Sequence, residues 1–384
     1  MDQQEKDALE FFEEFMEKEQ AEEALDMSHI TKREGRITCN ISPSNLLCLA
    51  EPRVDLDNLS QNGFNLNEEI HLQSWEKFFT MLNGPTYGAL VKEFWKMAEC
   101  DRHHIVSHVS GKRVIITKKT IGDLLGLDHR EGIRIGGRNE KDEFISNVID
   151  KEIFIDLDPT KPTSEYKSIS LVPKLRIWYQ ILINCINPKP LNLISENLNA
   201  DQKYFLYHLK NKDKLCLPAI LFLHLKYSIQ NSRTTADKDE EKIKYIPFGR
   251  LISAILVENG IIEHLREEEA LNSIDLTPGF GDTFNGKNLK EMEVIKDILT
   301  EPPSEAEEII LKRRRITNDL PPFTKEEPFE ATAEFVRMQV EDGKDMSWFS
   351  YDMLPDTMEE IYGGKKKKKK SAERDMANKR KDDA

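Results

Sequence analysis

The chain has 384 residues, of which 39% are hydrophobic and 32% are charged, and its formal net charge is −14. This length and composition predict one large domain or two smaller ones with a real core, flanked by solvated segments. Five widely spaced cysteines without a Cys-x-x-Cys pair argue against a disulfide scaffold and indicate reduced thiols in a nuclear or cytoplasmic protein.

Two targeting features are missing from the sequence. The N-terminus is acidic, unlike that of a secretory signal peptide. The longest apolar run, residues 216–225, is interrupted by Pro218 and His224 and is too short for a membrane helix. We therefore expect no membrane association and no secretion.

Charge is distributed unevenly along the chain. Residues 363–384 hold ten Lys or Arg and four Asp or Glu, a net charge of +6, which leaves about −20 for the rest. An acidic body with a basic tail argues against a broad nucleic-acid footprint on the body.

The N-terminal segment, residues 1–35, is predicted to form an acidic amphipathic helix that is partly disordered. Its apolar residues recur at helical spacing and share one face. One interpretation is a partner-binding acidic-aromatic helix, and the simpler one is a solvated helix that docks one side on the body or frays. The apolar stripe comprises Ala8, Phe11, Phe12, Phe15 and Met16.

The body, residues 36–275, begins with an irregular, turn-rich lead-in over residues 30–67. A short apolar helix is predicted from Trp75 to Leu82, because Gly84 follows it. Apolar residues at helical spacing then predict a second helix over residues 87–98.

A hairpin and a capped helix follow. Two β-branched runs, residues 105–109 and 113–117, flank Ser110-Gly111, which supplies the turn that a hairpin needs. Thr117 or Thr120 can cap the next helix, and Gly126 ends it.

Residues 128–161 are polar and predicted to form a loop, including a glycine-rich stretch that lacks the ending of a P-loop. Further helices are predicted over residues 171–186, 202–209, 217–229 and 248–257, with a last turn at 261–265. The predicted fold class is mainly α: an irregular helical domain with one small β-hairpin, flanked by flexible charged tails.

The C-terminal part divides into two predicted segments. Residues 276–362 form an acidic, proline-interrupted flexible arm, with short helices over 289–299, from Ser304 onward, and over 329–340. Residues 363–384 form a basic disordered tail.

Four pieces of the body together carry a family resemblance. They are Leu90-Val91-Lys92-Glu93-Phe94-Trp95, Val109-Ser110-Gly111-Lys112, Ile121-Gly122-Asp123-Leu124-Leu125-Gly126-Leu127 and Ile246-Pro247-Phe248-Gly249-Arg250-Leu251-Ile252. In combination they resemble the putative plant transposon protein domain, found in retrotransposon-derived plant proteins that are sometimes labelled envelope-like. The resemblance covers residues from about 75 to about 265. It implies ancestry and supplies no catalytic residues, and the missing anchor disfavours an envelope role.

Two sets of residues are candidate metal sites. Cys100, His104 and His108 are spaced by four and could bind zinc on one helix, but the predicted strand would disperse them. Asp156 and Asp158 could serve metal-dependent strand transfer from the end of a strand at 153–155, but a third acid is not evident and Pro159 favours a turn. We expect no catalytic residues, no cofactor and no metal.

The basic clusters are the clearest short signal. Such blocks are bound by nuclear import receptors or bind phosphates non-specifically, and the alternative is a tail that only increases solubility. The candidate residues are Lys312, Arg313, Arg314, Arg315, Lys365, Lys366, Lys367, Lys368, Lys369, Lys370, Lys379, Arg380 and Lys381.

Three functional hypotheses follow. The first is a non-enzymatic, retrotransposon-derived plant protein that binds protein partners and is targeted to the nucleus by its tail. The second is a nucleic-acid-binding factor that uses the tail and a basic face of the body. That face would consist of Lys92, Lys96, Arg102, Lys112, Arg113, Lys118 and Lys119. The third is a degenerate transposase-like enzyme.

Overall fold

The computed structural model of the chain describes residues 37–39, 41–137, 144–155, 167–189, 197–234, 244–267, 276, 278–279, 281–302, 324–341, 351 and 354. The chain divides into two compact units, residues 1–300 and residues 301–384. The expected N-terminal acidic helix and the expected basic tail lie outside the described residues. The mainly α fold class is confirmed.

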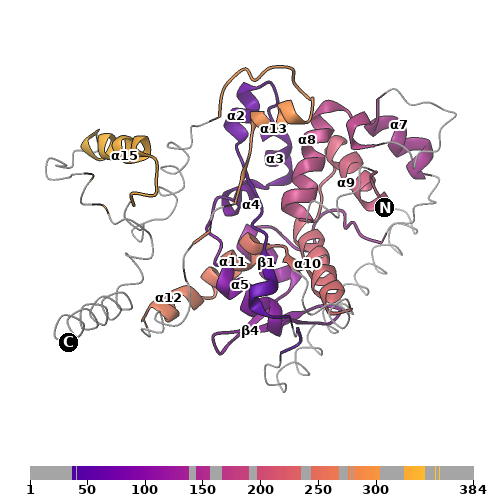
Figure 1. The fold of residues 1–384 in the computed structure, drawn as a ribbon. Helices are drawn as coiled ribbons and strands as arrows, with labels where there is room; N and C mark the ends of the chain where they lie inside the picture. Colours follow the sequence, from indigo (N-terminus) through magenta and orange to yellow (C-terminus); the bar gives the residue numbers. More distant parts are fainter. Residues whose placement is uncertain are drawn as a thin grey trace, which may run out of the picture. The chain divides into compact units, whose positions relative to one another are not determined.

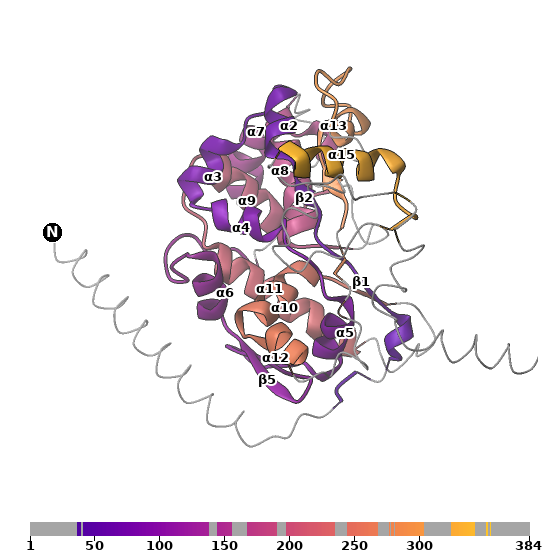
Figure 2. The ribbon, with the colours of Figure 1, turned by 90° about the vertical axis from the view of Figure 1, so that its left-hand side faces the viewer.

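The helices of the first unit are short, apart from one of 18 residues. They are α2 (Leu56–Gln61), α3 (Asn67–Gln73), α4 (Glu76–Met81), α5 (Gly88–Met97), α6 (Lys118–Leu125), α7 (Asp150–Ile153), α8 (Pro173–Ile181), α9 (Ala200–Lys210), α10 (Leu217–Thr234), α11 (Gly249–Glu258), α12 (Ile261–Glu267) and α13 (Gly286–Glu291). Figures 1 and 2 place α2 and α13 side by side, far from α12 and the β-hairpin.

The central hairpin forms as the sequence predicts, in a three-stranded antiparallel sheet. Its strands are β3 (Glu99–Cys100), β4 (Ile105–Val109) and β5 (Lys112–Ile116). Ser110 and Gly111 both have positive φ, 50° and 76°, as a type I′ turn requires. The second strand therefore starts and ends one residue earlier than expected.

The predicted caps of α6 are also present. The Thr117 side chain accepts a hydrogen bond from the Thr120 backbone N–H, and the Thr120 hydroxyl accepts one from the Thr117 N–H. Gly126 ends the helix with φ at 67°. Both ends of this helix are thus fixed by local sequence.

The irregular lead-in expected over residues 30–67 is wrong, because this range contains two strands, the whole of α2 and the first residue of α3. Strand β1 (Leu46–Cys48) pairs in parallel with β6 (Lys244–Ile246). Strand β2 (Arg53–Val54) pairs in parallel with β7 (Thr283–Phe284). These strands are two or three residues long, too short to show an alternating pattern, and their partners lie far away in sequence.

Two further elements differ from the expectation. The loop predicted over residues 128–161 contains a π-helical turn, Ile145–Ile149, that continues into α7. Ile145, Ile149 and Ile153 recur every four residues and are buried, which explains the helix. The single helix predicted over residues 171–186 is α8 followed by a second π-helical turn, Leu182–Ile186.

The core of the first unit packs α5 against the hairpin and α10 against α6. Ser107 of β4 donates a hydrogen bond from Oγ to the Phe94 carbonyl of α5 at 2.6 Å. The Glu93 carboxylate accepts one from the Ser110 N–H at 2.8 Å. These bonds lock the turn of the hairpin to the helix that covers it.

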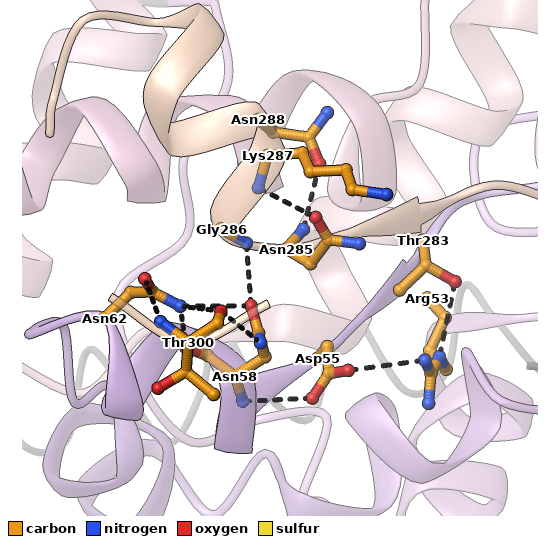
Figure 3. Close-up of polar contacts among 10 residues, drawn as sticks. All are labelled: Arg53, Asp55, Asn58, Asn62, Thr283, Asn285, Gly286, Lys287, Asn288 and Thr300. Atoms are coloured by element: carbon orange, nitrogen blue, oxygen red, sulfur yellow. Dashed lines mark hydrogen bonds and ion pairs between the residues drawn. The ribbon is translucent and has the colours of Figure 1, made fainter. Parts of the chain in front are cut away.

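The first unit extends to residue 300, whereas the sequence placed the end of the body at 275. Asn62, which follows the last residue of α2, donates from its side-chain amide to the Thr300 carbonyl at 2.9 Å (Figure 3). Its side-chain oxygen accepts a hydrogen bond from the Leu299 N–H at 2.7 Å. Asn58 accepts from the Gly286 N–H at 2.9 Å. The helix predicted over 289–299 is instead α13, which Asn285 caps and which ends at Glu291.

In the second unit, the described residues centre on α15 (Phe329–Glu341), which agrees with the helix predicted over 329–340. The rings of Phe329 and Tyr351 lie edge to face, with centroids 5.3 Å apart.

Candidate functional site

The Ile246–Ile252 motif surrounds a buried carboxylate. Glu51, which is 1% exposed, accepts hydrogen bonds from the backbone N–H groups of Arg250 (2.7 Å) and Leu251 (3.2 Å) in the first turn of α11. Burial raises the pKa of Glu51, while these hydrogen bonds and the Arg250 charge oppose the rise. Glu51 thus caps a helix to which it is not adjacent in sequence.

The other residues of this motif also serve packing. The Arg250 guanidinium donates to the carbonyls of Leu82 and Gly84, at 2.7 Å for the latter, and so holds the end of α4. A Cβ atom at Gly249 would lie 2.8 Å from the Cys48 sulfur and from the Leu49 carbonyl oxygen. The motif therefore joins α11, α4 and β1, and its glycine permits the close approach.

The remaining motifs build structure as well. A Cβ atom at Gly122 would lie 2.6 Å from the Leu127 carbonyl oxygen. Leu90, Val91, Phe94 and Trp95 are all buried. The buried residues of these motifs thus determine how the body folds, and a binding site has to be sought among exposed residues in and beside the motifs.

An open groove lies beside α5, with a volume of about 970 Å³. We call it the α5 groove, and three segments supply most of its lining: residues 43–50, helix α5, and the described residues of 279–282. Its lining comprises Ile37, Pro43, Ser44, Leu47, Cys48, Leu49, Ala50, Thr86, Gly88, Ala89, Lys92, Glu93, Lys96, Met97, Gly279, Gly281 and Asp282.

Apolar and cationic side chains share this groove. Leu47, which lines the groove, is 47% exposed. Lys92 and Lys96 lie one helical turn apart on α5. The groove therefore offers apolar contact and two ammonium groups on one helix, beside the carboxylates of Glu93 and Asp282, which suits an amphipathic ligand.

The thiol in the groove is poorly suited to nucleophilic chemistry. Burial, with a smaller contribution from the Glu51 charge, raises the pKa of Cys48 to about 12. A thiol with that pKa is almost fully protonated at neutral pH, whereas the thiolate is the reactive form.

The three candidate zinc ligands do not share one helix face, because they lie on the three-stranded sheet and on its β3–β4 connection. Cys100 lies on β3 and His108 on β4, while His104 is buried and its Nδ1 lies 3.3 Å from the Asp101 carboxylate. No group of three or more His, Cys, Asp or Glu able to hold a metal ion occurs among the described residues.

The strand expected at residues 153–155 is wrong. Ile153 ends α7, and Phe154 forms an isolated bridge with Leu171. Asp156 and Asp158 lie outside the described residues. So do all the candidate basic residues of 312–315, 365–370 and 379–381.

The basic residues that the nucleic-acid-binding hypothesis requires do not all lie in one place. Lys92 and Lys96 line the α5 groove, whereas Arg102 and Lys118 line a separate, smaller cavity. Lys119 pairs with Asp123 at 2.7 Å. Within the described part of the chain, no helix has the length and apolar character needed to cross a membrane.

The sequence predicts α5 and its lysines but does not predict the groove beside this helix. Two of its three walls come from residues 43–50 and 279–282, which were assigned to an irregular lead-in and to a flexible arm. No local pattern signals their meeting, because it depends on the parallel pairs β1–β6 and β2–β7.

Comparison with known proteins gives one match. No curated protein matches the chain, and neither does any solved structure. A family model described as "putative plant retrotransposon-related domain" matches residues 71–262, half of the chain. All four motifs lie inside that range, which agrees with the predicted coverage of about 75 to 265. The chain belongs to this family of plant retrotransposon-related domains.

Proposed function

We propose that this retrotransposon-derived chain is a non-enzymatic protein-interaction domain, and that its α5 groove binds an acidic amphipathic segment of a protein partner. The observation that carries the proposal is that the exposed side chain of Leu47 and the side chains of Lys92 and Lys96 line the same open groove.

The dimensions and chemistry of the groove support this function. A volume of about 970 Å³ lies at the upper end of the range for ligand pockets, and the groove is open, so it can take a peptide segment. Peptide segments that lie in grooves bind through a few apolar anchors, and charges at the rim add specificity. On the α5 wall two lysines face one acid, Glu93, whose carboxylate accepts hydrogen bonds from Ser110 of the hairpin, so this wall carries a net positive charge.

The basic clusters supply the second part of the proposal. Lys312–Arg315, Lys365–Lys370 and Lys379–Lys381 have the composition that import receptors bind, and we infer that they direct the protein to the nucleus. A fluorescent fusion of the full chain should be nuclear, and replacing all three clusters with glutamine should make it cytoplasmic.

The groove is tested with peptides selected on the full chain from a random library. We expect the selected peptides to carry aromatic or leucine anchors flanked by acids. Leu47→Glu should weaken the binding of such a peptide by roughly tenfold or more, because it removes an anchor and adds a repelling charge.

The matched control is Leu72→Glu. Leu72 is exposed to a similar degree, 44%, but lies on α3 and does not line the groove. Equal affinity of the selected peptides for wild type and for Leu47→Glu would refute the proposed binding site.

A further inference from the structure

The α5 groove lies where the described part of the chain begins. Ile37, the first described residue, lines the groove and is 53% exposed. The next residue is fixed to the last turn of α5, because the Thr38 backbone N–H and hydroxyl both donate to the Lys96 carbonyl, at 2.9 and 3.0 Å. Residues 1–36 therefore join the body beside the groove. We propose that the groove binds an acidic, aromatic stretch of this same chain, residues 5–20, in competition with partner segments.

The N-terminal stretch has the composition that the groove favours in a ligand, so this inference rests on the proposed function. Residues 1–26 contain eleven Asp or Glu and two Lys, a net charge of −9. Within them, Phe11, Phe12, Phe15 and Met16 recur at helical spacing, so a helix would present them on one face bordered by acids. Aromatic side chains are effective anchors in a groove because each buries a large area and orders few rotatable bonds.

The groove offers matching contacts to such a segment. Leu47 is an exposed apolar side chain in its lining. No ion pair or side-chain hydrogen bond joins Lys92 or Lys96 to another described residue, so both ammonium groups are available to an acidic ligand. Of the two acids in the lining, Glu93 accepts hydrogen bonds from the hairpin turn and Asp282 belongs to another segment. The α5 wall therefore attracts acids, and the apolar part of the groove accepts aromatic side chains.

The connection to Ile37 lets the segment reach the groove and raises its local concentration. Residues 17–36 lie between the aromatic residues and Ile37, and a coil of 20 residues has an r.m.s. end-to-end distance of roughly 25 Å. A linker of that length gives an effective concentration of about 1 mM. A segment with a Kd of about 100 µM as a separate peptide would then weaken a competing ligand about tenfold. A partner segment that binds more tightly displaces it, so the groove remains available for the proposed function.

The test measures the binding of a fluorescent peptide of residues 5–20 to the full chain by fluorescence anisotropy. The test variant, Phe11→Ser/Phe12→Ser/Phe15→Ser, removes the anchors of the attached segment but none of its charge. Because wild type already holds its own segment, we expect the peptide to bind this variant roughly tenfold more tightly than wild type. Phe11→Leu/Phe12→Leu/Phe15→Leu keeps apolar anchors, and its affinity for the peptide should lie within about threefold of wild type.

The matched control alters three polar residues of the same segment. Gln3→Ser/Gln4→Ser/Gln20→Ser keeps the charge and the aromatic residues, and the peptide should bind it within about twofold of wild type. A control that gains as much affinity as the test variant would overturn the inference, because the aromatic residues would then have no special role.

Two lysine pairs show where the peptide binds. In the triple-serine background, Lys92→Gln/Lys96→Gln should weaken peptide binding roughly fivefold, because two attractive charges are lost. Lys77→Gln/Lys287→Gln removes two exposed lysines that do not line the groove, and it should change the affinity by less than about twofold. Equal weakening by both pairs would show attraction by net charge alone and would overturn the inference.

The remaining outcomes separate this inference from the proposed function. Equal binding of the peptide to wild type and to the triple-serine variant, or no binding to either, would overturn the inference. The proposed function would still stand if library-selected peptides lose affinity on Leu47→Glu, and it would fail as well if they do not. Light scattering that shows a wild-type dimer and a triple-serine monomer would also overturn the inference, because the segment would then occupy the groove of a second copy.

Discussion

The Glu51 carboxylate accepts the Arg250 backbone N–H at 2.7 Å, across 199 positions of sequence. The Arg250 side chain in turn holds the carbonyls at the end of α4. These contacts explain the Ile246–Ile252 motif, because Arg250 and Gly249 allow α11, the end of α4 and β1 to pack together. It also places β1, and with it Leu47, at the wall of the α5 groove.

The first prediction concerns pH. Because burial raises the pKa of Glu51, the folded state holds this proton more tightly than the unfolded chain does. The stabilisation by protonated Glu51 is complete below about pH 4.5 and is lost as the pH rises through the raised pKa. The stability of wild type relative to Glu51→Gln should therefore fall as the pH rises above about 4.5. Urea unfolding of both proteins across this range measures the difference; a constant or rising difference contradicts the prediction.

The second prediction contrasts two glycines. Gly249→Ala should lower the free energy of unfolding by about 1–3 kcal/mol, because the new methyl group meets the Cys48 sulfur and the Leu49 carbonyl oxygen at 2.8 Å. Gly88→Ala, at the first residue of α5, has nothing within 4 Å and should be neutral or stabilising by up to about 1 kcal/mol. Thermal unfolding compares the two, and similar midpoints would show that the close approach at Gly249 is absent.

The third prediction tests where the body ends. Asn62→Ala removes the side chain that holds Leu299 and Thr300, and it should cost about 1–3 kcal/mol because buried backbone groups lose their partners. Limited proteolysis should then cut within residues 281–300 faster than in wild type. Asn67→Ala, an exposed asparagine of α3, is the control and should leave the cleavage rate unchanged.

The fourth prediction concerns the thiol in the α5 groove. With its pKa raised to about 12, Cys48 should react with iodoacetamide at pH 8 at least roughly a hundredfold more slowly in the folded chain than in urea. Mass spectrometry of the Cys48 peptide gives both rates. Fast labelling of the folded protein would mean that the thiol is activated, and a nucleophilic role would then return to consideration.

The sequence predicted those parts of the fold whose cause is local. The β4–β5 hairpin depends on Ser110-Gly111, and α6 depends on Thr117 and Gly126, so each is visible within ten residues. Helix α10 was found because its apolar run is long. Residues 144–153 were missed because their three isoleucines are set among polar residues that resemble a loop.

The candidate site was less predictable, for a physical reason. The α5 groove exists because β1 reaches β6 and β2 reaches β7, pairings of two or three residues across about 200 positions. The smaller cavity lined by Arg102 and Lys118 likewise combines four segments, and only these two of its cationic residues belong to the basic face expected from the sequence. Tertiary pairing, rather than local propensity, brings these side chains together.

The most direct test of the account is hydrogen–deuterium exchange of the full chain with and without a selected acidic peptide. If the peptide binds in the α5 groove, exchange should slow in residues 43–50, in the first turns of α5 and in residues 279–282, with no change in residues 102–136. Protection confined to 102–136, or to residues 365–384, would contradict the α5 groove as the binding site of this protein.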